Sequence, residues 1–210
     1  GREYCLNDCA KINLGRVFEL AFDELTADPE VQPTLDALWQ RFGWHLRQAV
    51  DVMAEVYDFH VEHKHEVFPE LVLDLCCYGP LEQGEDASHH GVEYINFGLD
   101  AAALATVADS FAAIEQRVEK EHRLTWARLA DLIHSDWAGA EGEQARLMMH
   151  SIARFGSGGS RADEWAVRVT RAFVDTVKAR PTPAGYNMIP GHFSWANTIP
   201  MGKVLGATPN

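Results

Sequence analysis

The stretch that decides the fold lies close to the end of the sequence and reads Gly191-His-Phe-Ser-Trp195 and, after six further residues, Gly202-Lys-Val-Leu-Gly-Ala-Thr-Pro-Asn210. Apolar and β-branched residues between Phe193 and Val204 favour an extended backbone. Glycine and proline residues on either side of this segment interrupt regular structure. We therefore predict a strand over residues 193–204.

Upstream of this stretch the sequence predicts helices, because apolar residues recur at the three- and four-residue spacing of one helix face. The predicted helices span residues 12–25, 34–67, 101–118, 125–134, 141–154 and 163–179. Residues 79–98 are predicted to form a loop, and residues 156–160 a break that fits either a domain linker or a tight helix–helix connection. The predicted fold class is α/β and predominantly helical, with residues 1–210 in a single domain.

The composition excludes several classes of protein. The chain has 210 residues, 47% of them hydrophobic, and a formal net charge of −13. This charge argues against binding to nucleic acid or to an anionic membrane, since both need a basic surface. The sequence contains no apolar run long enough to span a bilayer and no signal peptide, so we expect a cytoplasmic protein. Disulfides are therefore not expected among the cysteines, which are Cys5, Cys9, Cys76 and Cys77.

Two further motifs lie close together in the middle of the chain. They read Leu81-Glu-Gln-Gly-Glu-Asp-Ala-Ser-His-His-Gly-Val-Glu-Tyr-Ile-Asn96 and Leu104-Ala-Thr-Val-Ala-Asp-Ser-Phe-Ala-Ala-Ile114. Together with the closing stretch, they resemble the glycyl radical enzymes, the pyruvate formate-lyase-like family. The resemblance covers nearly the whole chain, and its strongest parts are residues 81–114 and 181–210.

The resemblance implies a fold and a set of partners. Members of this family have a ten-stranded α/β barrel, of which this chain would be a fragment. The glycine that stores the radical would lie on a missing C-terminal segment, where a radical-SAM activating enzyme installs the radical. No cofactor is expected in the fragment itself, and the full-length enzyme is expected to be a homodimer that acts on a small-molecule substrate.

The resemblance also implies a reactive cysteine. Tyr4 precedes Cys9 by five positions, as a tyrosine precedes the thiyl-forming cysteine of the family on a loop that enters the barrel. A cysteine suits this role because its weak S–H bond gives a sulfur radical that abstracts hydrogen, while the protein supplies positioning and excludes solvent. A small buried cysteine at a helix start is the alternative reading. Lys11 stands where most members have a glutamate, and the next helix follows almost at once.

The residues expected to contact the substrate come from both ends of the chain. They are Tyr4, His192, Phe193 and Trp195. Alternation along the predicted strand places His192 on one face and both Phe193 and Trp195 on the other, and only one face can line a barrel. A core strand without substrate contact remains the alternative.

The implied reaction is cleavage of a C–C, C–O or C–N bond by a thiyl radical. Asp8, rather than a second cysteine, precedes Cys9, which favours a lyase or dehydratase over a formate acetyltransferase. One alternative is a catalytically inactive homologue, as Lys11 suggests. Another is a helical metal-binding protein built on His60, His63 and His65, whose imidazoles could hold zinc. A charged, solvated helix face is the favoured reading of these histidines, so no metal site is predicted.

Overall fold

The computed structural model describes residues 2–193, 203 and 205–209, with residues 5–9 described by their backbone alone. These residues form two compact units. The sheet unit consists of Gly1–Ile12, Arg47–Ala101 and Phe173–Gly191, and the helical unit consists of Asn13–Leu46, Ala102–Ala172 and His192–Asn210. Each unit is described separately below.

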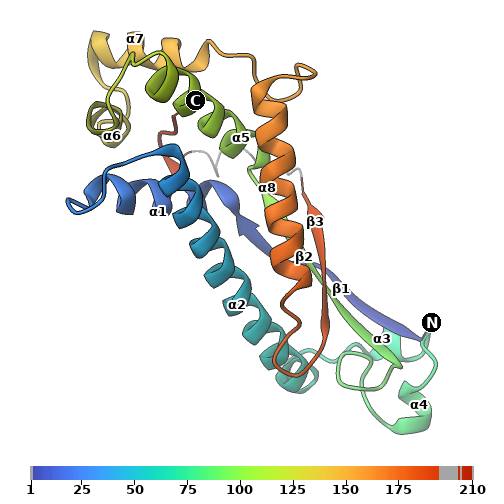
Figure 1. Cartoon of the computed structure of the whole chain (residues 1–210). Coiled ribbons are helices and arrows are strands. Elements are labelled where there is room, and N and C mark those ends of the chain that lie inside the picture. The colour runs from blue at the N-terminus through green and yellow to red at the C-terminus, as the bar shows by residue number, and fades with distance from the viewer. Residues whose placement is uncertain (1, 194–202, 204, 210) are drawn as a thin grey trace. The chain divides into compact units, whose positions relative to one another are not determined.

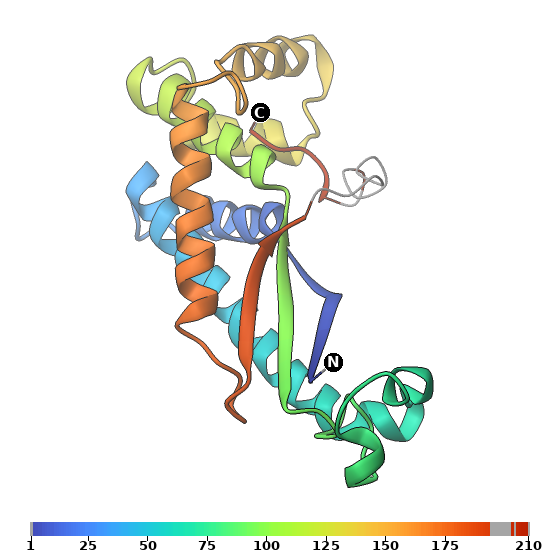
Figure 2. The ribbon, with the colours of Figure 1, turned by 90° about the vertical axis from the view of Figure 1, so that its right-hand side faces the viewer.

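The sheet unit is built on three parallel strands. They are β1 (Glu3–Asn13), β2 (Tyr94–Ala102) and β3 (Asn187–His192), in the order β1-β2-β3. The backbone N–H of Tyr94, where β2 begins, donates to the carbonyl of Arg2, just before β1, at 3.0 Å. The three strands therefore start at the same end of the sheet, and Figures 1 and 2 show them side by side. Helices occupy the long connections, as parallel pairing requires.

The helix α2 (Leu35–Val67) covers one face of this sheet with its second half. The ring of Tyr57 stacks on Phe97 of β2 with ring centroids 4.4 Å apart, and its hydroxyl donates to the carbonyl of Gly98 at 2.6 Å. Two short helices, α3 (Leu71–Asp74) and α4 (Pro80–Gln83), follow α2 before the chain enters β2.

The helical unit surrounds an aromatic centre. Its elements are α1 (Leu14–Ala27), the first part of α2, α5 (Leu104–Ala113), the π-helix η1 (Ile114–Lys120), α6 (Trp126–His134), α7 (Gly139–His150) and most of α8 (Arg161–Lys178). Phe111 is fully buried, and its ring meets those of Phe18, Trp39, Phe42 and Trp165 at centroid distances of 5.0, 5.6, 5.6 and 4.6 Å. Such clusters add ring–ring attraction to the burial of apolar area.

Glu115, a buried acid of η1, connects the helices around this centre. Its carboxylate accepts hydrogen bonds from Arg161 Nε and Trp165 Nε1, both at 2.7 Å, and pairs with Lys120 Nζ at 2.8 Å. Burial alone would raise the pKa of Glu115, but these three donors outweigh it and hold the pKa at about 2. Glu115 therefore stays ionised inside the unit and fixes η1 against α8.

Asp109, the acid of the predicted Ala-Asp-Ser helix, fixes a second connection. It accepts hydrogen bonds from Arg154 Nε at 3.0 Å and from the backbone N–H of Phe155 at 2.7 Å, so it ties α5 to the segment after α7. Ser110 donates to the carbonyl of Thr106 at 2.7 Å. Both polar groups are thus satisfied by the helix packing, as we expect for buried polar side chains.

The fold class α/β, predominantly helical, is confirmed, and the described strands form an open sheet. The strand predicted over residues 193–204 lies mostly outside the described part, which lacks residues 194–202 and 204. Of the two residues described there, Phe193 is not in a strand and Lys203 is helical, while β3 (Asn187–His192) comes just before the predicted range. Two strands were missed. β1 lies where the resemblance implied a loop carrying Cys9, and β2 lies where a loop and the start of a helix were predicted. No helix among the described residues is long and apolar enough to cross a membrane.

Candidate functional site

The strand β1 carries both residues of the predicted Tyr–Cys motif. Tyr4 is 5% exposed, and its hydroxyl accepts a hydrogen bond from Lys64 Nζ at 2.9 Å. Lys64, on α2, also lies 5.3 Å from the centroid of the Tyr4 ring. Burial raises the pKa of Tyr4, and the nearby ammonium group offsets this only in part. Tyr4 is therefore a neutral phenol at neutral pH.

Lys64 bonds both Tyr4 and Glu70, and the sequence analysis did not identify it as a site residue. Burial works against its charge, but hydrogen bonds to Glu70 and Tyr4 outweigh that effect and raise the pKa of Lys64. Its side chain is only 10% exposed. The signal was present in the sequence, because Tyr57, Val61 and Lys64 follow one another at helical spacing on the buried stripe of α2.

The other face of the sheet is polar. Glu3, Asn96 and Asp100 are exposed or half-buried, whereas their strand neighbours Tyr4, Ile95, Phe97, Leu99 and Ala101 are buried. The amide of Asn96 donates to Glu3 at 2.7 Å across β1 and β2. We call this surface the polar face. It carries carboxylates and an amide on rigid strands, which is a suitable base for binding a small polar molecule.

Close approach between two strands shapes this polar face. A Cβ atom added to Gly191 of β3 would collide with the carboxylate of Asp100. The absence of a side chain at Gly191 therefore allows Asp100 to lie across the neighbouring strand.

Cys9 lies in β1, so the loop that the resemblance implied at this position is not observed. The strand runs directly into α1, where Asn13 caps the helix by accepting from the backbone N–H of Gly15 at 3.0 Å. β1 ends at Asn13 and α1 begins at Leu14, so no residues remain between them to form a loop. Cys9 occupies an odd-numbered position of β1, as do Glu3 and Lys11.

The remaining predicted site residues lie at the end of β3 and directly after it. His192 ends the strand and is exposed, and Phe193 after it is half-buried. Trp195 lies outside the described residues. The structure brings Tyr4 together with Lys64 and Glu70. That Cys9 and Phe193 line one cavity stays a prediction.

The predicted metal-binding candidates His60, His63 and His65 of α2 have different surroundings. His63 is largely exposed beside the ring of Phe59, whereas His65 stacks on His89 with ring centroids 3.8 Å apart. The Nε2 atom of His60 is buried and has no hydrogen-bond partner among the described atoms. Nowhere in the described part of the chain do three or more His, Cys, Asp or Glu residues form a group that could hold a metal ion.

The adjacent histidines of the Leu81–Asn96 motif belong to a hydrogen-bonded segment. His89 Nδ1 lies 3.1 Å from a carboxylate oxygen of Glu85, and His90 Nδ1 lies 3.3 Å from the hydroxyl of Tyr186. His89 and His90, which lie in the loop predicted over residues 79–98, thus both have hydrogen-bond partners.

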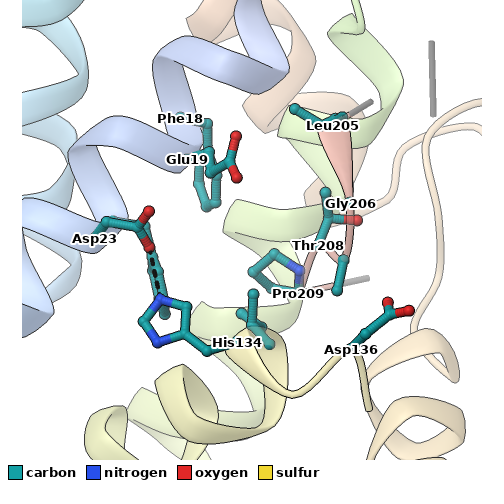
Figure 3. Close-up of a pocket in the computed structure, with 12 residues that line it drawn as sticks. Phe18, Glu19, Asp23, His134, Asp136, Leu205, Gly206, Thr208 and Pro209 are labelled. Atoms are coloured by element: carbon teal, nitrogen blue, oxygen red, sulfur yellow. Dashed lines mark hydrogen bonds and ion pairs between the residues drawn. The ribbon is translucent and has the colours of Figure 1, made fainter. Parts of the chain in front are cut away.

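The helical unit contains a separate pocket of about 300 Å³ (Figure 3). The residues that line it come from α1, the end of α6, Asp136 after it, and residues 205–209. Two of them, His134 and Asp23, lie 3.0 Å apart. Phe18, Phe22 and Pro209 supply apolar surface, whereas Glu19 and Asp136 add carboxylates. No single motif could predict this pocket, since its segments are far apart in the chain.

Comparison with known proteins shows the family of the chain. The model of the family described as pyruvate formate lyase-like matches residues 1–202. The (2S)-3-sulfopropanediol dehydratase of Klebsiella oxytoca is 23% identical over 99% of this chain, and the trans-4-hydroxy-L-proline dehydratase of Clostridioides difficile is 22% identical over 88%. The chain spans 27% and 23% of the length of these two relatives.

Solved structures agree in fold. The B12-independent glycerol dehydratase from Clostridium butyricum superposes on the whole chain with a TM-score of 0.83 at 21% identity, and the chain covers 28% of it. A glycyl radical enzyme from Archaeoglobus fulgidus superposes with a TM-score of 0.85 at 21% identity, again with 28% of that chain covered. From the family match over residues 1–202, the chain belongs to the pyruvate formate lyase-like family of glycyl radical enzymes.

Proposed function

We propose that this chain is part of a glycyl radical enzyme that cleaves a C–C, C–O or C–N bond of a small molecule, and that it belongs to the lyase or dehydratase branch. Dehydratases and an isethionate sulfite-lyase are among the relatives. Asp8 before Cys9 supports the same branch, because formate acetyltransferase chemistry needs a pair of adjacent cysteines. The observation that carries the proposal is the polar face of a parallel sheet whose edge strand contains the Tyr4–Cys9 spacing.

We propose that β1, β2 and β3 are three strands of a ten-stranded barrel and that residues 1–210 form one piece of this barrel domain. Parallel order, helical connections and one helix-covered face support this arrangement. In a barrel of parallel strands, the polar face would be the inner one. It would then present Asn96 and Asp100 to a substrate with hydroxyl or ammonium groups.

In the proposed reaction, Cys9 transfers hydrogen. Its sulfur radical takes a hydrogen atom from a substrate C–H bond, forming S–H and a carbon radical, and returns the hydrogen after the bond cleavage. His192, Phe193 and Trp195 hold the substrate and exclude water. Tyr4, which was expected to do the same, lies on the opposite face of β1 from the polar face and is bonded to Lys64, so its part in the proposal is to support β1. The glycyl radical, on a segment outside this sequence, supplies the oxidising equivalent, and a radical-SAM activating enzyme installs it. We also propose that the full-length enzyme is a homodimer and lies in the cytoplasm.

The test is a pair of cysteine variants in the full-length enzyme after activation. Cys9→Ser should abolish turnover of candidate substrates such as glycerol, 1,2-propanediol and trans-4-hydroxy-L-proline, while the glycyl doublet in electron spin resonance stays at wild-type intensity. Cys5→Ser in the same strand is the matched control and should retain activity. Turnover by Cys9→Ser would place the reactive thiol elsewhere.

A catalytically inactive homologue is the second candidate, because Lys11 stands where the family has a carboxylate. In that case no substrate would be consumed by the wild-type protein, even with a full glycyl signal. Lys11→Glu should then restore measurable turnover if the missing carboxylate is the cause. Unchanged inactivity of Lys11→Glu would point to a loss of the substrate contacts instead.

A further inference from the structure

The pocket of the helical unit has a first wall, formed by α1, that combines aromatic rings with acids (Figure 3). Residues four positions apart share one face of a helix. Phe18 and Phe22 therefore form an apolar row, and both are almost fully buried. Glu19 and Asp23 form an acidic row beside it. Two acids at this spacing repel each other, and a cation bound near them removes that repulsion.

The second wall is the segment of residues 205–209. Leu205 lies so close to α1 that a Cβ atom added to Gly15 would come within 2.8 Å of its side chain. Pro209, at the other end of the segment, is buried. Both ends are therefore packed, and they hold the segment in place as a wall. In Figure 3 the carboxylate of Glu19 points from α1 toward this segment.

The end of α6 and the turn after it form the third side. His134 Nε2 lies 3.0 Å from the carboxylate of Asp23, so it joins α6 to α1. Asp136 and Trp137 follow with φ of 54° and 55°, a left-handed conformation that is uncommon for residues other than glycine. Trp137 is buried, and its burial holds this turn so that Asp136 stays in the lining. Backbone strain of this kind accumulates where proteins hold ligands.

Charge decides which ligands fit this pocket. Three carboxylates line it, those of Glu19, Asp23 and Asp136, and none of the described lining residues is a lysine or an arginine. Arg16 pairs with Glu19 at 2.6 Å, and His134 holds Asp23. Each carboxylate has two oxygens and can accept further hydrogen bonds. The lining therefore repels an anion and attracts an ammonium group.

Size and apolar surface decide the rest. The volume of about 300 Å³ is at the lower end of the range for small-molecule sites. The rings of Phe18 and Phe22 offer apolar contact, and aromatic faces also attract cations. We propose that this pocket binds a small organic ammonium ion, with its charged group on Glu19 and a compact apolar body against Phe22 and Pro209. The inference concerns the helical unit alone and goes beyond the proposed reaction.

Benzylamine, which is protonated at neutral pH, is the probe, and benzyl alcohol is the uncharged control of the same shape. Both are titrated by calorimetry into the full-length enzyme without its glycyl radical, so that no turnover interferes. Benzylamine should bind about tenfold more tightly than benzyl alcohol, because hydrogen bonds to charged groups contribute at least that factor. Benzoate, with the opposite charge, should not bind.

A pair of variants tests the assigned carboxylate. Glu19→Gln should weaken the binding of benzylamine about tenfold. Asp131→Asn removes the same charge from an exposed position of α6 outside the pocket, and it should leave the affinity unchanged. Hydrogen exchange locates the site: benzylamine should slow the exchange of amides in residues 18–23 and 133–136.

Several outcomes would overturn the inference. Equal affinities for benzylamine and benzyl alcohol would show that the pocket does not recognise charge, and this comparison needs no variant. Equal weakening by Glu19→Gln and Asp131→Asn would indicate only long-range attraction to an acidic protein. Protection from exchange only in other residues would place the amine elsewhere. Cys9→Ser should bind benzylamine as the wild type does, so this inference and the proposed function fail separately.

Discussion

The two units differ in where they place apolar and charged side chains. In the helical unit the aromatic rings meet at the centre around Phe111, and the buried acids Glu115 and Asp109 are paired with arginines. In the sheet unit the side chain of Lys64 is largely buried against Tyr4 of β1, while seven large apolar side chains of residues 67–81 are exposed.

This difference indicates which surfaces of the chain bind partners and substrate. The helical unit satisfies its own core, so we expect substitutions in that core to act on stability. The sheet unit has two such surfaces, the polar face and the exposed apolar side chains of residues 67–81. We therefore expect substitutions at the aromatic centre to act on stability and binding to involve the polar face, and the predictions below test this division.

The largest expected effect is that of Phe111→Ala. Removing a ring that contacts four other aromatic side chains leaves a cavity, and we expect a loss of about 4 kcal/mol in the free energy of unfolding of the helical unit. Native-state hydrogen exchange of the amides of α5 measures it. Phe68→Ala, at an exposed ring, is the control and should change the exchange little. Equal effects of both variants would contradict the division.

Glu115→Gln should have the next largest effect on stability. The folded-state pKa of about 2 lies below the ordinary 4.5, so ionised Glu115 stabilises the fold fully above pH 4.5, and this stabilisation is lost as the pH falls through 2. The shift corresponds to roughly 3 kcal/mol. Unfolding of the wild type and of Glu115→Gln is compared from pH 7 to pH 3, and the difference should shrink on acidification.

A matched control for Glu115 is Glu143→Gln. Glu143 pairs with Arg146 on the exposed side of α7. Surface ion pairs contribute little, so this variant should leave the stability and its pH dependence unchanged. A pH-independent difference between wild type and Glu115→Gln would instead indicate a packing effect.

Lys64→Met should weaken the sheet unit by about 2 kcal/mol, because Glu70 and Tyr4 would lose their buried donor. Faster hydrogen exchange in residues 67–74 should accompany the loss, since Glu70 ties this segment to α2. Lys178→Met, at the exposed end of α8, provides the comparison and should have no effect. Unchanged exchange in Lys64→Met would show that the segment is held by other contacts.

Tyr4→Phe should have the smallest effect, about 1 kcal/mol, because only the hydroxyl is lost. The pKa of Tyr4 is raised above 10.0, so its neutral form stabilises the fold below that pH, and the contribution is lost as the pH rises through the folded-state pKa. The wild type should therefore lose more stability than Tyr4→Phe above pH 10. Tyr78→Phe, at an exposed ring, should behave like the wild type.

The helices could be predicted from the sequence because they depend on local spacing. Helices were predicted to begin at Thr34 and Thr125, and both residues cap helices. Thr34 accepts from the backbone N–H of Ala37 and Thr125 from that of Arg128, each at 3.1 Å. The strands could not be predicted in the same way. β2 contains Gly98, Ala101 and Ala102, which have low strand preference, and its pairing with β1 involves distant residues.

The site was predicted only in part for the same reason. Tyr4 and Cys9 are close in sequence, so a motif could select them. The partner of Tyr4 is Lys64, 60 residues away, and the charge pattern of residues 60–66 suggested a solvated face. The polar face combines residues of separate strands, so no single stretch of sequence shows it.

The order of the strands along the chain has a consequence for how the protein folds. Glu3 and Asn96, which touch across β1 and β2, are 93 residues apart. Pairings at such separation close long loops and form slowly. A ribosome that adds about 5–20 residues per second needs roughly 5–20 seconds between completing β1 and completing β2. We expect α1 and α2 to form in that interval, while β1 waits as an unpaired ribbon that a chaperone can bind.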